Sequence, residues 1–167
     1  PGDLRQNPLQ LLCISQDRIK RVVTLDSSGT TGLPKRVFFT AEDQELTWDF
    51  FQHGMSTLVQ PGDKVLILLP GELPGSVGDL LADGLRRLQA LPIHHGLVRD
   101  PGAVLEIMTK ERIDSLVGIP TQVLSLACSE SPVQGADKIF LKSVLLSTDH
   151  VPVTIVSYLK KTWGCRV

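Results

Sequence analysis

The sequence predicts an α/β fold in which alternating strands and helices form a mostly parallel sheet flanked by helices. Three observations indicate this fold class. The run Lys64–Leu69 is almost continuously apolar, as in a parallel strand buried on both faces. Residues Ser76–Leu88 carry leucines at helical spacing, with charged residues off that stripe. Strand-like and helix-like segments then alternate along the chain, which favours right-handed crossover connections.

The amino-terminal part is expected to form two strands and a long helix. β-Branched and aromatic residues predict strands at Arg21–Leu25 and Arg36–Phe39. Thr40 is suited to cap a helix that runs from Ala41 to Val59. Three apolar side chains on one face of that helix are expected to face the core: Leu46, Phe50 and Leu58.

The alternation continues beyond Pro61-Gly62-Asp63, which turns the chain into the strand Lys64–Leu69. Asp100-Pro101 supplies an N-cap and a first-turn proline, and Gly164 can end the last helix. The expected elements are a helix at Ser76–Leu88 (Val77, Leu80, Leu81, Leu85 and Leu88 inward), a short strand around Ile93, a helix from Pro101 to about Arg112, a strand at Asp114–Ile119, a helix at Pro120–Ala127, a loop at Ser129–Asp137, a strand at Lys142–Ser147 and a helix at Val153–Trp163.

Composition restricts the class of protein. With 167 residues, 42% of them hydrophobic, the chain can bury one core, so residues 1–167 are interpreted as a single α/β subdomain. A formal net charge of -1 and the lack of a basic stripe argue against nucleic-acid binding. No apolar run reaches the length of a membrane span. Three widely spaced cysteines (Cys13, Cys128 and Cys165) suit reduced thiols in the cytoplasm.

The histidines and cysteines predict no metal site. No two cysteines form a metal pair, and His94 and His95 are adjacent. Neighbouring residues on a strand point to opposite faces, so these two imidazoles cannot hold one ion together. One of them is expected to face the core or a pocket and the other to face outward.

The most informative segment is Ser27-Ser28-Gly29-Thr30-Thr31-Gly32-Leu33-Pro34-Lys35. Its glycines allow a tight backbone turn close to a ligand, and its hydroxyls and lysine are donors for phosphoryl oxygens. The spacing differs from that of the P-loop of kinases and GTPases, and Pro34 precedes a strand instead of a helix. A phosphate-binding loop between two strands is therefore predicted, with a plain Ser/Thr/Gly turn as the alternative.

The order of these nine residues resembles the phosphate-loop signature of the adenylate-forming superfamily, with the phenylacetate-CoA ligase branch nearest in character. This resemblance implies a reaction in which a carboxylate attacks the α-phosphorus of ATP and a thiol, CoA, then takes the acyl group. It implies phosphate contacts for Ser27, Ser28, Gly29, Thr30, Thr31, Gly32 and Lys35. The small carboxylic acid is not identified, and no residue is assigned a catalytic role.

A nucleotide or substrate pocket is expected beside this loop. Ligands of open α/β sheets gather beyond the carboxyl ends of the strands, where two turn-rich segments follow predicted strands. The candidate residues there are Gly71 and Glu72 in one segment and Ser147, Thr148 and Asp149 in the other. Many relatives have a Gly-Gly or Gly-Ala pair near the adenine where this chain has Ser147-Thr148-Asp149, so adenine contact there stays open.

The resemblance also predicts what the chain lacks. A Tyr-Gly-x-Thr-Glu segment, whose glutamate would hold Mg²⁺, should follow Cys165-Arg166-Val167, and a ribose-binding aspartate and a small carboxyl-terminal domain should follow later. The chain is therefore expected to be a fragment, inactive alone, that forms a homodimer or associates with the missing half. Two alternatives stay open: a noncatalytic nucleotide-binding or protein-interaction module, and an unrelated α/β domain.

Overall fold

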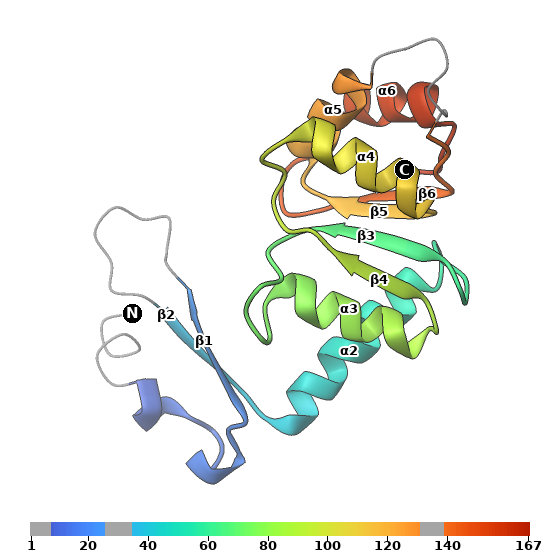
Figure 1. Ribbon diagram of the computed structural model, residues 1–167. Coiled ribbons are helices and arrows are strands. Elements are labelled where there is room, and N and C mark those ends of the chain that lie inside the picture. The colour runs from blue at the N-terminus through green and yellow to red at the C-terminus, as the bar shows by residue number, and fades with distance from the viewer. Residues whose placement is uncertain (1–7, 26–34, 131–138) are drawn as a thin grey trace. The chain divides into compact units, whose positions relative to one another are not determined.

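The computed structural model describes residues 8–25, 35–130 and 139–167. The chain divides into two compact units, Pro1–Thr47 and Trp48–Val167, which are described separately. Figure 1 shows the elements of both units along the chain.

The first unit contains a two-stranded antiparallel sheet. β1 (Arg21–Leu25) pairs with β2 (Lys35–Phe39), and Arg21 lies opposite Phe39 in the register. Two short 3₁₀ turns precede the sheet, η1 (Pro8–Leu11) and η2 (Gln16–Arg18). Because β1 ends at residue 25 and β2 begins at residue 35, the predicted phosphate-binding segment connects two strands, as expected. Residues 26–34 themselves lie outside the described residues.

A reciprocal capping box starts the helix that follows. The Thr40 hydroxyl accepts a hydrogen bond from the Asp43 amide at 3.1 Å, and the Asp43 carboxylate accepts one from the Thr40 amide at 2.8 Å. These two bonds satisfy backbone donors that a helix leaves unpaired at its first turn. The predicted N-cap is therefore confirmed, and α2 runs from Ala41 to Met55.

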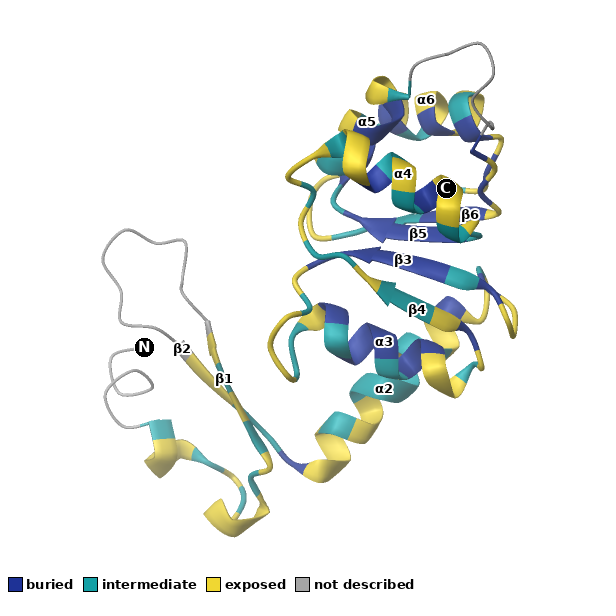
Figure 2. Ribbon diagram, in the orientation of Figure 1, coloured by how far each residue is buried: buried dark blue, intermediate teal, exposed yellow. Residues whose placement is uncertain are grey.

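The second unit is built on a four-stranded sheet with the order β4-β3-β5-β6, and every neighbouring pair is parallel. The strands are β3 (Lys64–Leu68), β4 (Leu91–His94), β5 (Ser115–Gly118) and β6 (Ser143–Leu146). Figure 2 shows β3 and β5, the two central strands, as largely buried. The predicted α/β class with a parallel sheet is confirmed.

Helices cover both faces of this sheet (Figure 1). They are α3 (Val77–Arg87), α4 (Pro101–Glu111), α5 (Pro120–Ser129) and α6 (Val153–Trp163). One core cluster joins Val65 and Ile67 of β3 to Leu81 and Leu85 of α3 and to the carboxyl end of α2. The other joins Leu66 and Leu68 of β3 to α4, α5 and α6. Successive β3 side chains therefore enter opposite cores, which explains the continuous apolar run in the sequence.

The last helix agrees with the sequence prediction at both ends. α6 covers Val153–Trp163, and Gly164 ends it with a left-handed backbone at φ 65°. Beyond it, residue Arg166 makes a single parallel bridge to Ser143 of β6.

The expectation for α2 is partly wrong. The helix ends at Met55 and not at Val59. After Met55 the chain closes in a turn, in which the Leu58 and Val59 amides both donate to the Met55 carbonyl oxygen at 2.9 Å. The inward face also differs, because Leu46 and Phe50 are 67% and 72% exposed. Met55 is buried in the core instead, with Phe51 packed against it.

A polar network at the amino end of the sheet was not anticipated. Lys142 makes ion pairs with Asp63 at 2.5 Å and with Asp114 at 2.9 Å, and the Lys64 amide donates to Asp114 at 2.9 Å. The hydrogen bonds that the Lys142 ammonium donates to Asp63 and Asp114 raise the pKa of Lys142 to about 12. Residues 63, 114 and 142 directly precede β3, β5 and β6. The network therefore joins the amino ends of these three strands.

Candidate functional site

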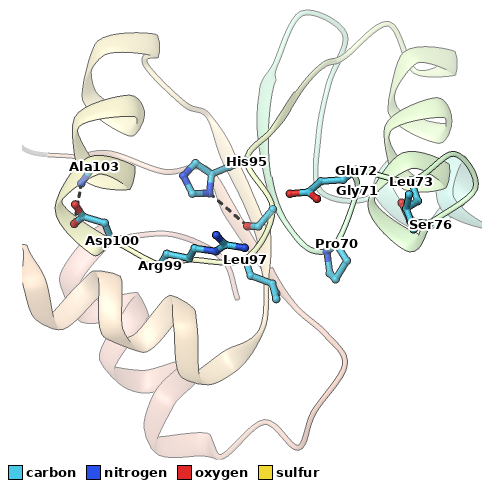
Figure 3. Close-up of a pocket in the computed structure, with 11 residues that line it drawn as sticks. Pro70, Gly71, Glu72, Leu73, Ser76, His95, Leu97, Arg99, Asp100 and Ala103 are labelled. Atoms are coloured by element: carbon cyan, nitrogen blue, oxygen red, sulfur yellow. Dashed lines mark hydrogen bonds between the residues drawn. The ribbon is translucent and has the colours of Figure 1, made fainter. Parts of the chain in front are cut away.

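A cavity of about 520 Å³ lies beyond the carboxyl ends of β3 and β4 (Figure 3). One wall is the loop from β3 to α3, with Pro70, Gly71, Glu72, Leu73 and Ser76. The other wall is the loop from β4 to α4, with His95, Gly96, Leu97, Arg99, Asp100 and Ala103. This is the edge of a parallel sheet at which α/β proteins bind ligands.

The first wall is held by a close approach of α3 to the end of β3. The Gly78 amide donates to the Pro70 carbonyl oxygen at 2.8 Å, and the Asp79 carboxylate accepts from the Gly75 amide at 2.6 Å. A Cβ atom on Gly78 would come within 2.7 Å of the Pro70 oxygen, and one on Gly71 within 2.8 Å of His94 Nδ1. Glycine at both positions therefore lets the wall pack against its neighbours.

The second wall is fixed from three sides. The His95 and Gly96 amides both donate to the Ile67 carbonyl oxygen, at 3.1 and 3.2 Å, which ties the loop to β3. The Gln122 side chain of α5 accepts from the Val98 amide at 2.9 Å. Asp100 caps α4 by accepting from the Gly102 amide at 2.9 Å. The loop is thus positioned by β3, α4 and α5 together.

Polar groups and apolar surface both line the cavity. Within the described part of the chain, Ser76 Oγ is buried and has no hydrogen-bond partner. Figure 3 shows the Glu72 side chain extending between the walls, toward the His95–Gly96 loop. Leu73 and Leu97 add apolar surface to the lining and are 74% and 43% exposed. The cavity therefore combines apolar contact area with a few donors and acceptors, which is typical of small-molecule sites.

The structure brings together some of the candidate residues and not others. Gly71 and Glu72 line the cavity. Ser147, Thr148 and Asp149 follow β6, which β5 separates from β3, and they do not line it. Asp149 accepts a hydrogen bond from the His150 backbone amide at 2.7 Å, so this contact does not involve the imidazole. Thr148 has a left-handed backbone, at φ 75°.

Sequence reasoning does not single out Ser76, Leu97 or Arg99. In the sequence, Ser76 marks only the start of a helix. Gly71 was predicted because ligands of α/β sheets bind beyond the carboxyl ends of the strands. The same rule applied to the neighbouring strand β4 would have predicted the loop with Leu97 and Arg99. Of the two adjacent histidines, His95 lines the cavity, whereas His94 is exposed and lies over Gly71. Among the residues that the structure describes, no group of three or more His, Cys, Asp or Glu side chains is arranged to hold a metal.

The phosphate-loop residues Ser27, Ser28, Gly29, Thr30, Thr31 and Gly32 lie outside the described residues. Lys35 is the first residue of β2, paired with Leu25 of β1. The phosphate contacts expected of these six residues and of Lys35 stay a prediction. In residues 8–25, 35–130 and 139–167, no helix is long and apolar enough to span a bilayer.

Comparison with known proteins supports the predicted family at the level of fold. No protein-family model matches the chain. Two feruloyl-CoA synthases, from Amycolatopsis sp and Streptomyces sp, are each 27% identical over 131 residues, which is 78% of this chain and 26% of theirs. An open conformation of 2-hydroxyisobutyryl-CoA ligase, in complex with 2-HIB-AMP and CoA, superposes on 99% of this chain and 40% of its own, with a TM-score of 0.76 and 16% identity.

A second solved structure extends the agreement. The amide bond synthetase McbA from Marinactinospora thermotolerans matches 88% of this chain and 28% of its own, with a TM-score of 0.67 and 23% identity. The neighbours are CoA ligases and other adenylate-forming enzymes, so this chain has the fold of part of such an enzyme. The chain spans about a quarter of the length of the curated relatives it matches.

Proposed function

We propose that the chain is part of an ATP-dependent carboxylate ligase of the acyl-CoA synthetase type. In the proposed reaction, a carboxylate oxygen of a small acid attacks the α-phosphorus of ATP and pyrophosphate leaves. The thiol of CoA then attacks the acyl carbonyl carbon of the adenylate, and AMP leaves. The nine-residue segment from Ser27 to Lys35, connecting two strands in a chain with this fold, is the observation that carries the proposal.

The segment is assigned to the leaving pyrophosphate. Its hydroxyls and backbone amides offer several donors over a short stretch, and Lys35 adds a positive charge. Charge that develops on the departing phosphates is stabilised by donors already in place, and this electrostatic contribution is a large part of catalysis in phosphoryl and adenylyl transfer. Ser27, Ser28, Gly29, Thr30, Thr31, Gly32 and Lys35 are the proposed contacts.

The cavity beyond β3 and β4 is assigned to the acyl part of the acid. Apolar contact with Leu73 and Leu97 would remove the acyl chain from water, and the wall groups Glu72 and Arg99 would fix its orientation. The contribution of these residues is to hold the acid so that its carboxylate can meet the phosphorus in line, since alignment lowers the barrier without covalent help. No residue of the cavity is given a covalent or proton-transfer role.

Magnesium is proposed to accompany ATP. The described residues hold no cluster of carboxylates suited to the ion, so no residue of this chain is assigned to it. Because the relatives are longer than this chain, we propose that activity needs the region they have in addition, in the same polypeptide, in an associated one or through a second copy. Three free cysteines fit the cytoplasm as the proposed compartment.

Titration of the ¹⁵N-labelled chain with ATP and, separately, with an aryl carboxylic acid tests the proposal. ATP is expected to shift amide signals of residues 26–36, and the acid is expected to shift those of Gly71 and Gly96 at the cavity. Two separate sets of shifted signals would support the assignment of two substrates to two sites. A chain whose amide signals respond to neither compound would refute it.

A further inference from the structure

The second wall of the cavity includes a short segment, residues 95–98, that is tied down at both of its ends. Two amides at its first end donate to the Ile67 carbonyl oxygen of β3, at 3.1 and 3.2 Å. At its other end the Val98 amide donates to Gln122 Oε1 of α5, at 2.9 Å. β4 and β5 lie on opposite sides of β3, so the segment that follows β4 is held by a helix that follows a strand on the far side of β3.

The Gln122 side chain lies where a glutamine can instead bond within its own helix. Gln122 is the third residue of α5, and in a capping box a glutamine there accepts from the backbone amide of the N-cap residue. The N-cap of α5 is Ile119, which makes no side-chain capping bond. The oxygen of Gln122 accepts from Val98, 24 positions earlier in the chain. The bond therefore stabilises the cavity wall and not the start of α5.

The position of Leu97 depends on both ties. Leu97 lies between them, lines the cavity (Figure 3) and is 43% exposed. The residue before it, Gly96, has a left-handed backbone at φ 80°, and a glycine leaves the backbone free to rotate. The Val98 side chain packs against the core cluster below α4, α5 and α6, but apolar packing is not directional. The bond to Gln122 is directional, so it fixes the orientation of the Leu97–Val98 peptide.

We propose that Gln122 is a positioning residue of the cavity, which holds the Leu97–Val98 peptide so that the Leu97 side chain contacts the bound acid. The inference rests on the proposed function, because it takes the cavity to be the acyl site. Gln122 does not itself line the cavity, so its effect on the acid is transmitted by the wall. Loss of its acceptor oxygen should therefore weaken binding of the acid.

Two substitutions separate the hydrogen bond from the shape of the side chain. Gln122→Met keeps the length and loses the acceptor, whereas Gln122→Glu keeps an acceptor oxygen. Cinnamate is titrated into each chain at neutral pH, in enough salt to screen the added charge, while the amide signals of Gly71 and Gly96 are followed by NMR. We expect Gln122→Met to weaken binding by about 3- to 10-fold and Gln122→Glu to stay within about twofold of the parent chain.

Gln60→Met is the matched control, because Gln60 is exposed and does not line the cavity. It should bind cinnamate as the parent chain does, and far-UV circular dichroism checks that all variants fold. If Gln122→Met does not fold, hydrogen exchange of the Val98 amide in the parent chain decides the question. Cinnamate at about ten times its Kd should slow this exchange about 10-fold, because opening of the wall would release the acid. An unchanged exchange rate would overturn the inference.

The outcomes separate this inference from the proposed function. Weaker binding by Gln122→Met that is restored in Gln122→Glu supports the inference. Equal binding by Gln122→Met and the parent chain overturns it and leaves the proposed acyl site intact. An equal loss in both variants also overturns it, because the acceptor oxygen is then not what holds the wall. Failure of cinnamate to shift the cavity signals of the parent chain overturns the acyl site, and this inference with it.

Discussion

Substitution of Gly78 by alanine is expected to destabilise the chain and to distort the cavity. The new Cβ would lie 2.7 Å from the Pro70 carbonyl oxygen, 3.0 Å from Gly71 Cα and 3.1 Å from the Leu69 oxygen, whereas ordinary contacts begin at 3.4 Å. All three atoms belong to the backbone, so a side-chain rotation cannot relieve the contact. α3 or the Pro70–Gly71 wall has to move.

The size of the effect follows from opposing contributions. Overpacking a well-fitted site costs about 1–3 kcal/mol. Weakening the hydrogen bond from the Gly78 amide to Pro70 adds about 1 kcal/mol, and the better helix propensity of alanine offsets about the same amount. We therefore expect the free energy of unfolding to fall by about 1–3 kcal/mol. Because Pro70 and Gly71 line the cavity, affinity for the acid should fall as well.

Urea unfolding followed by circular dichroism measures this change, with Gly54→Ala as the matched control. Gly54 is also in a helix, α2, but a Cβ there would meet nothing within 4 Å. The same substitution at that position should stabilise the chain by up to about 1 kcal/mol through helix propensity. Equal or greater stability of Gly78→Ala would show that the close approach of α3 to the end of β3 does not hold the wall as argued.

Three further outcomes are expected. Burial by itself raises the pKa of Asp114, but hydrogen bonds from Lys142 and the Lys64 amide lower it overall, below 3.8, so stability that depends on the ionised form should be lost as the pH falls below 3.8. Acid unfolding curves should be flatter for Asp114→Asn than for the parent chain, and parallel curves would contradict this. Glu130→Ala should lower the free energy of unfolding by about 1–3 kcal/mol, because the buried Trp163 Nε1 loses an acceptor at 2.6 Å; denaturant titration of tryptophan fluorescence measures it, and an unchanged midpoint would count against it. The 167-residue chain alone should not exchange labelled pyrophosphate into ATP at an enzymatic rate, and robust carboxylate-dependent exchange would disprove this.

Much of the fold could be predicted because its signals are local. The apolar run of β3, the Asp100-Pro101 start of α4 and the Gly164 end of α6 each depend on a few adjacent residues. The end of α2 could not be predicted from its apolar spacing, because the chain closes in a turn on the Met55 carbonyl oxygen, which accepts from the Leu58 and Val59 amides. Propensity and spacing do not show at which residue the backbone bonds change from a helix to a turn.

The site was less predictable because its contacts are distant in the sequence. Gly71 and Glu72 were found from their position after a strand, which is a rule of topology. The first wall of the cavity depends on the hydrogen bond from the Gly78 amide to the Pro70 carbonyl oxygen, which only the folded backbone reveals. In the same way, the ion pair between Asp63 and Lys142 joins residues 79 positions apart, and no sequence pattern predicts it.

The central claim, that the segment from Ser27 to Lys35 binds the phosphates of ATP, is tested most directly by calorimetric titration of pyrophosphate into the chain and its variants. Thr31→Ala and Lys35→Ala should each lower the affinity, Lys35→Ala by about 10- to 100-fold because it loses a charged hydrogen bond. Lys20→Ala, a lysine outside the segment, should bind as the parent chain does, and all variants should melt at nearly the same temperature. Equal affinity of the parent chain, Thr31→Ala and Lys35→Ala would contradict the claim.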